Sequence, residues 1–239
     1  MAEDVNRSDY EGRDLEVLSD VPNYYAWIME SFQPLLRGRA LEIGAGIGTF
    51  SRHLLPHVSS LDVLEPSQHL VPVLQSTFKN TEKASVLSQS LEDFLQHSQQ
   101  NYDVIIMVNV LEHIEDDKTA LQGLWQRLNP GGYLLIYVPA LPSLYSQFDR
   151  QIGHFRRYTR PVLRECLEAA SFQILKIRYM DVLGILPWYL MNTLGGQVTL
   201  NPSAVKLYDS VGIPVTKFFE CFIPFPLGKN LIAVSHKKV

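Results

Sequence analysis

The sequence predicts an α/β fold in which a mostly parallel sheet carries helices on both faces. Apolar, strand-like runs alternate with helical stretches, and the first run ends in a glycine-rich turn. The chain has 239 residues, of which 46% are hydrophobic and 19% charged, which is enough for one large domain. The predicted strands of this domain are residues 40–43, 60–64, 84–87, 102–108 and 133–138.

Helical patterns separate these strands. Residues 21–36 carry apolar side chains at helical spacing ahead of the first strand, which predicts an amphipathic helix over the core. Further helices are predicted at 49–55, 67–78 and 116–128. The sequence Asn-Pro-Gly-Gly at 129–132 should end the last of these helices and lead into the next strand.

The pattern loosens after Pro139. A helix is predicted at 160–170, and strands at 172–179 and 230–235. Between these strands lies an insertion, 181–228, rich in proline, glycine and large apolar residues, which is too long for a turn and should form a cap of short helices. We therefore expect an acidic, mobile tail (1–20) and a single domain (21–239) comprising a ligand-binding core (about 38–139), a substrate loop (about 139–160) and the cap.

Composition excludes several classes of protein. A net charge of −4 gives no basic field for nucleic acid. The two cysteines, Cys166 and Cys221, have no metal-ligand or redox spacing, so reduced thiols and no metal are expected. No apolar run approaches the roughly 18 residues that span a bilayer, and the acidic N-terminus is unlike a signal peptide. These features predict a cytoplasmic protein without a transmembrane segment.

Three glycines, Gly44, Gly46 and Gly48, follow the first strand. Glycine tolerates positive φ and lets a ligand approach the backbone, and open α/β sheets bind ligands at the carboxyl ends of their strands. The dinucleotide fingerprint would need glycine where Thr49 stands, and Glu42 would repel a pyrophosphate. A carboxylate there suits a cationic ligand, so the loop favours a cationic nucleoside over a nicotinamide cofactor.

Glu65 ends the second strand about twenty residues after the glycine loop, where an acidic residue can accept both hydroxyls of a ribose. The alternative is that Glu65 is a carboxylate at a helix start, ahead of Pro66 and Ser67, where it suits the helix dipole.

The chain at this point resembles the class I S-adenosylmethionine-dependent methyltransferases. Four ordered motifs within about 40–139 carry the resemblance: LEIGAGIG (41–48), VLEPS (63–67), YDVI leading to NVLEHI (102–105 and 109–114), and LNPGG (128–132). The resemblance implies a Rossmann-like, seven-stranded sheet whose last strand is antiparallel, with S-adenosylmethionine as cofactor and S-adenosylhomocysteine as product.

The resemblance also implies roles for residues at the cofactor. Glu42 and Gly44 would hold the methionine end, Glu65 the ribose, and Asn109 would lie along the cofactor. The family often has an aspartate for the adenine where Ser90 stands here, so Ser90, the Leu91 backbone or Glu92 would serve instead. The remaining expected cofactor contacts are Ala45, Gly46, Gly48, Pro66 and Val110.

The segment after the fifth strand contains GHFRRYT (153–159), which resembles a subgroup of these enzymes acting on small molecules or glycans. Segments 23–27 and 227–234 accompany it in that subgroup. Arg156 and Arg157 could grip a carboxylate or phosphate of the acceptor. Alternatively they pair with Asp149, or with acids of the N-terminal tail, and order the loop.

Candidate catalytic and acceptor-binding residues come from the same half of the chain. His154 is the first candidate for a general base and His113 the second, with a structural imidazole as the alternative for each. Tyr145 and Tyr158 could orient the acceptor. Trp188 could line an apolar acceptor pocket in the cap, although the cap aromatics could equally form a helix core or an exposed face for a homodimer or a lipid-linked substrate.

The sequence thus predicts methyl transfer to a small or medium-sized acceptor, with an oxygen of a natural-product, lipid or sugar-type molecule as the expected target. Two alternatives remain open: a protein that binds S-adenosylmethionine as a cyclase or scaffold, and a nicotinamide-dependent oxidoreductase, which Thr49 and Glu42 disfavour.

Overall fold

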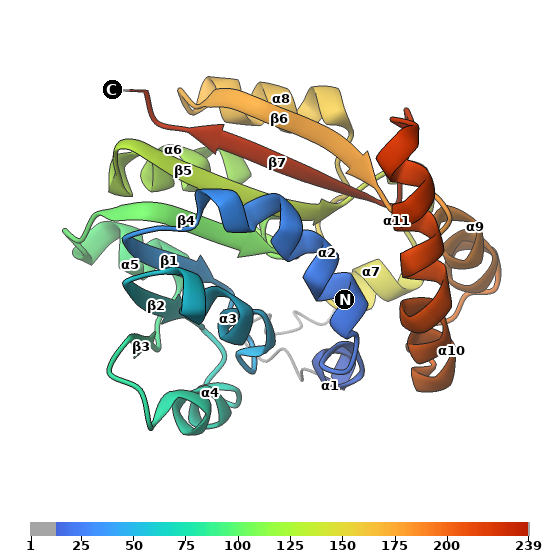
Figure 1. The fold of residues 1–239 in the computed structure, drawn as a ribbon, viewed down its shortest axis with the longest axis horizontal. Helices are drawn as coiled ribbons and strands as arrows, with labels where there is room; N and C mark the ends of the chain where they lie inside the picture. Colours follow the sequence, from blue (N-terminus) through green and yellow to red (C-terminus); the bar gives the residue numbers. More distant parts are fainter. Residues whose placement is uncertain (1–12, 239) are drawn as a thin grey trace, which may run out of the picture.

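A computed structural model describes residues 13–238, which form one seven-stranded sheet. Figure 1 shows helices on both faces of this sheet. The strand order is β3-β2-β1-β4-β5-β7-β6. The strands are β1 Arg39–Ile43, β2 Ser60–Leu64, β3 Ala84–Leu87, β4 Tyr102–Val108, β5 Leu128–Pro139, β6 Gln173–Met180 and β7 Asn230–His236. Strands β1 to β5 pair in parallel, and β7 is antiparallel to both of its neighbours, which confirms the predicted fold class.

Most predicted helices are present at nearly the expected bounds. They are α2 Pro22–Phe32, α3 Thr49–Leu54, α4 Val71–Phe78, α6 Asp117–Arg127 and α8 Arg160–Ala169. Two further short helices, α5 Leu91–His97 and α7 Gln147–Gln151, begin at Ser90 and Ser146, whose side chains accept hydrogen bonds from backbone N–H groups of the first turn.

Three local predictions are wrong. The helix expected from residue 67 begins at Val71, because the backbone first makes a turn in which Leu70 N donates to Ser67 O. The helix ahead of residues 129–132 ends at Arg127 as expected, but these residues belong to β5, which begins at Leu128 instead of 133, since Gly131 N donates to Lys237 O and Lys237 N to Gly132 O. The described part of the expected tail contains a helix, α1 Arg13–Leu18, while residues 1–12 lie outside the described residues.

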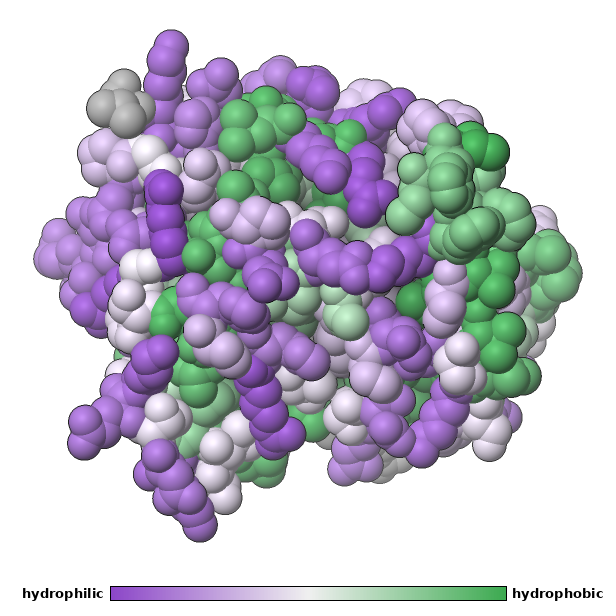
Figure 2. All heavy atoms as spheres, viewed as in Figure 1, coloured by the Kyte–Doolittle hydropathy of each residue, from purple (hydrophilic) through white to green (hydrophobic). Residues whose placement is uncertain are grey.

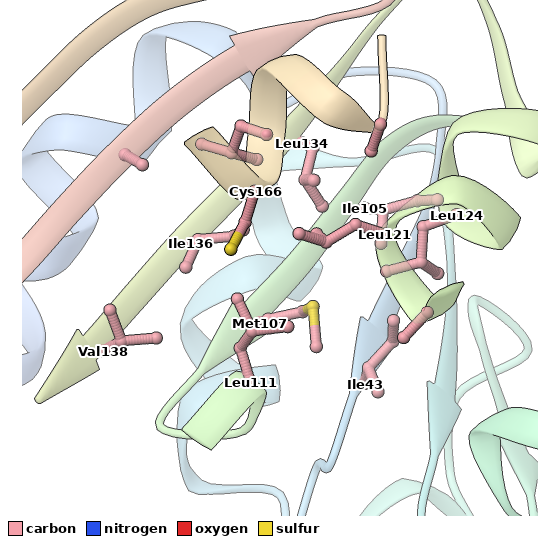
Figure 3. Packing of buried hydrophobic residues seen from close by; sticks show 14 of the residues in the cluster. Ile43, Ile105, Met107, Leu111, Leu121, Leu124, Leu134, Ile136, Val138 and Cys166 are labelled. Atoms are coloured by element: carbon pink, nitrogen blue, oxygen red, sulfur yellow. The ribbon is translucent and has the colours of Figure 1, made fainter. Parts of the chain in front are cut away.

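Two hydrophobic clusters hold the helices against the sheet. Alternate residues of β4 point to opposite faces, so Ile105 and Met107 pack with α5, α6 and α8, whereas Val104 and Ile106 pack with α2, α3 and α4. Figure 3 shows the first cluster, in which Cys166 of α8 lies near side chains of β5. Because both faces are covered, the sheet edge formed by the carboxyl ends of the parallel strands is where a ligand can approach.

The cap consists of short helices, as predicted. These are α9 Ile185–Trp188, α10 Pro202–Leu207 and α11 Ile213–Phe222, with the π-helical turns Tyr189–Leu194 and Tyr208–Gly212 between them. Figure 1 shows the cap beyond the carboxyl ends of β4 and β5. Figure 2 shows hydrophobic side chains gathered over it, and Leu186, Phe218 and Phe222 are exposed.

Polar contacts join the cap to α2. The carboxylate of Asp209 accepts hydrogen bonds from the backbone N–H groups of Asn23 and Tyr24 at 3.2 and 2.8 Å, so the cap satisfies the first turn of α2. Within residues 13–238, no helix has both the length and the apolar character needed to cross a membrane.

Candidate active site

The glycine loop between β1 and α3 has a backbone that only glycine adopts readily. Gly44, Gly46 and Gly48 have φ of 67°, 57° and 82°. A Cβ atom at Gly44 would lie 2.6 Å from Cγ2 of Val110, so the loop packs directly against the segment that follows β4. Gly46 and Gly48 are buried, and Leu15 of α1 lies against Gly46, so the loop is backbone closely packed at the carboxyl edge of the sheet.

Two buried carboxyl groups accompany this loop, Glu42 at 3% and Glu65 at 5% exposure. Burial raises the pKa of Glu42 to about 8, with a hydrogen bond to Ser51 opposing the shift and the charge of Glu65 adding to it. Oε2 of Glu42 is buried without a hydrogen-bond partner. An orphaned carboxyl oxygen beside a bare backbone loop fits a ligand that carries an ammonium or sulfonium group.

Glu65 holds the glycine loop in place. Its Oε2 accepts a hydrogen bond of 2.7 Å from Gly46 N, and its Oε1 one of 2.9 Å from Ser67 N. Glu65 therefore accepts from the turn at Ser67 and does not stand at a helix start, because α4 begins only at Val71. Each carboxylate oxygen has a second lone pair, so the same group can still accept from ribose hydroxyls.

The other expected cofactor residues lie in three places. Asn109, with φ of 54°, follows β4 and donates its backbone N–H to Tyr137 O at 2.8 Å, next to Val110. The Ser90 hydroxyl caps α5, accepting from Asp93 N at 3.0 Å and donating to Asp93 Oδ2 at 2.9 Å, so its polar atom is already engaged. Three expected residues lie in the loops after β1 and β2 and at the start of α5: buried Ala45, exposed Pro66 and buried Leu91.

The loop after β5 is organised around Asp149, which is fully buried. Its Oδ1 lies 2.8 Å from His154 Nδ1 and accepts from Arg157 Nε at 2.9 Å. Its Oδ2 accepts from Arg157 Nη2 at 3.1 Å and from Ser146 N at 2.9 Å. Burial alone would raise the pKa of Asp149, but the hydrogen bond with His154 and the charge of Arg157 outweigh it and hold this pKa below its usual range.

The arginines of GHFRRYT are paired within the protein. Arg157 also donates to Ala140 O and lies 4.6 Å from the ring centre of Trp188. Arg156 pairs with Asp117 at 3.0 Å, and Asp117 also accepts from the Tyr158 hydroxyl at 2.7 Å. This arrangement matches the alternative interpretation of the sequence, in which the two arginines pair with acidic residues and order the loop. Direct binding of an acceptor by Arg156, Arg157 or Tyr158 would require these bonds to break.

Trp188 and Tyr145 also make internal hydrogen bonds. Trp188 Nε1 donates to Leu144 O at 3.1 Å, which fastens α9 to the loop, and the Tyr145 hydroxyl donates to His154 O at 2.7 Å. Both side chains remain partly accessible. Of the residues expected to contact the acceptor, these two are partly exposed and, within residues 13–238, are not held by a hydrogen bond or ion pair to a buried carboxylate.

The two candidate bases lie side by side with a carboxyl group that sequence reasoning did not select. The rings of His113 and His154 meet edge to face with centroids 4.6 Å apart, and His154 Nε2 is 3.7 Å from Glu112 Oε1. Burial raises the pKa of Glu112 to about 7, and burial lowers that of His113 to about 3. The sequence held a signal for each of the two carboxyl groups that were not selected as site residues. Glu112 is adjacent to the candidate base His113, and Asp149 lies just ahead of GHFRRYT.

Comparisons with known proteins agree on one kind of domain. Residues 17–177 match a family model described as "Methyltransferase domain". A putative methyltransferase from Bacillus halodurans has the same fold, with a TM-score of 0.63 at 13% identity over 90% of this chain and 99% of that one. The N-methyltransferase NodS from Bradyrhizobium japonicum, solved in complex with S-adenosylhomocysteine, gives 0.60 at 17% identity over 95% and 97%.

The relatives found by sequence comparison match only part of this chain and part of their own length. A highly reducing polyketide synthase of Emericella nidulans is 21% identical over 74% of this chain and 8% of its own length. An uncharacterized methyltransferase of Mycobacterium tuberculosis is 27% identical over 51% of this chain and 60% of its own. Nodulation protein S of Sinorhizobium fredii is 31% identical over 40% of this chain and 45% of its own. The chain thus spans less than two thirds of each of these relatives.

The buried pair of Asp149 and Arg157 generates a stability prediction. Arg157→Ala should lower the free energy of unfolding by about 3–5 kcal/mol, because it leaves a buried carboxylate without its charged partner. Arg164→Ala, which breaks an exposed pair with Glu168, should cost no more than about 1 kcal/mol. Urea unfolding of the two variants checks this, and equal losses would contradict the role given to Asp149.

The raised pKa of Glu42 generates a pH prediction. Between its ordinary value of 4.5 and about 8 the folded state holds a proton that the unfolded state has lost, so this group makes stability fall as pH rises through that window. Glu42→Gln removes this dependence and should be more stable than the natural protein at pH 9 by on the order of 2–4 kcal/mol. The exposed Glu82→Gln is the control, and urea unfolding at pH 5, 7 and 9 measures the gap, which must widen with pH.

Proposed function

We propose that this chain, which belongs to the class I S-adenosylmethionine-dependent methyltransferases, transfers the methyl group to an oxygen of a small or medium-sized acceptor of natural-product, lipid or sugar type. The observation that carries the proposal is the pairing of an orphaned, buried carboxyl oxygen on Glu42 with a glycine loop of positive φ. Such a lining suits a cationic nucleoside, because a bound cation would stabilise the ionised form of Glu42, whose pKa burial raises to about 8.

The cofactor would be held by residues of the carboxyl edge. Glu42 would neutralise its ammonium group, Glu65 would accept from its ribose, and Asn109 and Val110 would lie along it. When bound, it supplies an electrophilic methyl group on a sulfonium. The protein's contribution to the displacement is then alignment of the acceptor, where effective molarities reach ~10⁵–10⁸ M.

The acceptor would meet His154. Its Nδ1 is held by Asp149, which orients the ring and leaves Nε2 directed towards Glu112. An acceptor hydroxyl at Nε2 could give its proton to the ring as its oxygen attacks the methyl carbon. His113 is the weaker candidate for base, because burial lowers its pKa to about 3.

The cap would supply the apolar part of the acceptor site. Trp188 and Phe148 pack edge to face with centroids 5.5 Å apart where α9 meets α7. The exposed apolar residues of the cap support contact with a lipid-like acceptor or with a second copy of the chain. An acceptor with an amine is the alternative, because the structural neighbour NodS is an N-methyltransferase.

The cofactor assignment is tested by calorimetric titration with S-adenosylmethionine, S-adenosylhomocysteine and NADH. The first two should bind and NADH should not. Glu65→Ala should weaken their binding by about 1–3 kcal/mol, because a hydrogen bond to a charged group is lost. The exposed Glu82→Ala should bind like the natural protein. NADH binding alone, or unchanged affinity in a folded Glu65→Ala protein, would overturn the assignment.

The role of His154 is tested by release of S-adenosylhomocysteine with a panel of hydroxyl and amine acceptors. His154→Ala should keep cofactor affinity and reduce turnover by about 10²–10⁴-fold, the usual contribution of a positioned base. His97→Ala, at an exposed position in α5, should leave turnover unchanged. Full activity of His154→Ala would remove it from the chemistry, and cofactor binding without any product would favour a protein that binds S-adenosylmethionine without transferring methyl.

A further inference from the structure

Three side chains that can bind a metal ion lie close together, those of Glu112, His113 and His154. One ligand atom from each residue lies within 4.8 Å of the other two. Glu112 and His113 belong to the short turn Leu111–His113 after β4, and His154 comes from the loop after α7. That loop is fastened to the turn by the hydrogen bond from Phe155 N to Glu112 O at 2.8 Å, so the grouping is built into the fold.

The carboxyl group of Glu112 provides the second observation. Its side chain is fully buried, and neither Oε1 nor Oε2 has a hydrogen-bond partner. Buried carboxylates are normally hydrogen-bonded, paired with a cation or bound to a metal. The closest approach to it by a basic side chain is that of His154 Nε2 at 3.7 Å, beyond hydrogen-bonding distance.

Both imidazoles are oriented as metal-binding histidines are. His154 Nδ1 is hydrogen-bonded to the carboxylate of Asp149, which leaves Nε2 on the side of Glu112. His113 has a hydrogen bond with the backbone of Gly153. A ligating histidine almost always uses its second nitrogen in this way, on a carboxylate or a backbone carbonyl, and such partners fix the ring and its tautomer.

We propose that Glu112, His113 and His154 form a binding site for a divalent transition-metal ion of the zinc class. Two imidazoles and one carboxylate suit zinc, iron or cobalt, whereas magnesium and calcium prefer oxygen ligands throughout. Bonds of about 2.0–2.2 Å at tetrahedral angles place ligand atoms about 3.3–3.6 Å apart, so the ligand atoms that span 4.8 Å must move a little over 1 Å closer when an ion binds.

Three protein ligands leave a coordination position open for water or an oxygen ligand. Because the site directly follows Asn109 and Val110, an acceptor hydroxyl could occupy that position, and the charge of the ion would then favour loss of its proton. A bound ion would occupy His154 Nε2, so activation of the hydroxyl by the ion would replace proton transfer to that nitrogen. This last step rests on the proposed function, whereas binding of the ion does not.

The three proposed ligands do not form a metal-binding motif in the sequence, so the sequence alone predicts no metal site. Glu112 and His113 are adjacent in sequence, but His154 reaches them only after β5, Pro142–Leu144 and α7 have returned the chain to the end of β4. The site is therefore a product of the topology.

The test uses untagged full-length protein, stripped with a chelator and titrated with Zn²⁺ by calorimetry and with Co²⁺ by visible absorption, with no cofactor or acceptor present. One ion per chain should bind, the Co²⁺ spectrum should show nitrogen and oxygen ligation, and Zn²⁺ should raise the melting temperature. Absence of all three signals in the natural protein would overturn the proposal without recourse to any variant.

Variants then locate the ion. His113→Ala and His154→Ala should each weaken Zn²⁺ binding by about 100-fold or more, and Asp149→Asn by about 10–100-fold, as is usual for a group that only orients a ligand. His97→Ala serves as the matched control with unchanged affinity. Unchanged affinity in folded His113→Ala and His154→Ala would place the ion elsewhere and overturn the proposal. Zn²⁺ binding without S-adenosylmethionine binding would instead refute only the proposed function.

Discussion

The buried carboxylate of Asp149 is the interaction on which the arrangement of the carboxyl edge depends. It receives hydrogen bonds from three directions: the start of α7 at Ser146, the ring of His154 and the guanidinium of Arg157. A buried charge with so many donors is stable only while all of them are in place. These bonds hold the loop after β5 in the arrangement that brings His154 to Glu112 and Arg157 to the ring of Trp188 in the cap.

The cap is attached to the same edge by polar contacts and by an apolar contact, in which Ile213, Val205 and Tyr208 pack with the cluster that contains α2. Asp209 caps α2, Asp181 pairs with Lys229 at 2.9 Å, and Glu220 accepts from Val182 N at 2.9 Å. Much of the cap's apolar surface is nonetheless exposed (Figure 2). An insertion fixed at its base but apolar on its outer side suits the binding of an apolar molecule or surface better than it suits stabilising the sheet.

Two carboxyl groups at this edge, Glu42 and Glu112, are buried with unpartnered oxygens, although burial of such groups destabilises a fold. Glu42 lies in β1, where its backbone is held by the neighbouring strands, and Glu112 lies in the turn after β4, where its backbone accepts a hydrogen bond from Phe155 N. Buried polar groups without partners, which destabilise a fold, are expected at sites where a protein binds ligands. Under the two proposals made above, the first would face a cationic nucleoside and the second a metal ion, which would place the cofactor and the acceptor side by side along this edge.

Sequence patterns determined the frame of this protein. Strands β1 to β4 begin and end within a residue of their predicted bounds, and the glycine loop and Glu42 pointed to a cationic ligand, because strand burial, helical period and positive φ are local properties of a chain. The tertiary structure decided the rest. Contacts between residues distant in sequence decided three features. They set the partner of Arg157 as Asp149 and not an acceptor, they set where β5 begins, and they brought His154 to Glu112 and His113. No local pattern encodes such contacts, since each partner is chosen by the packing of the whole sheet and its loops.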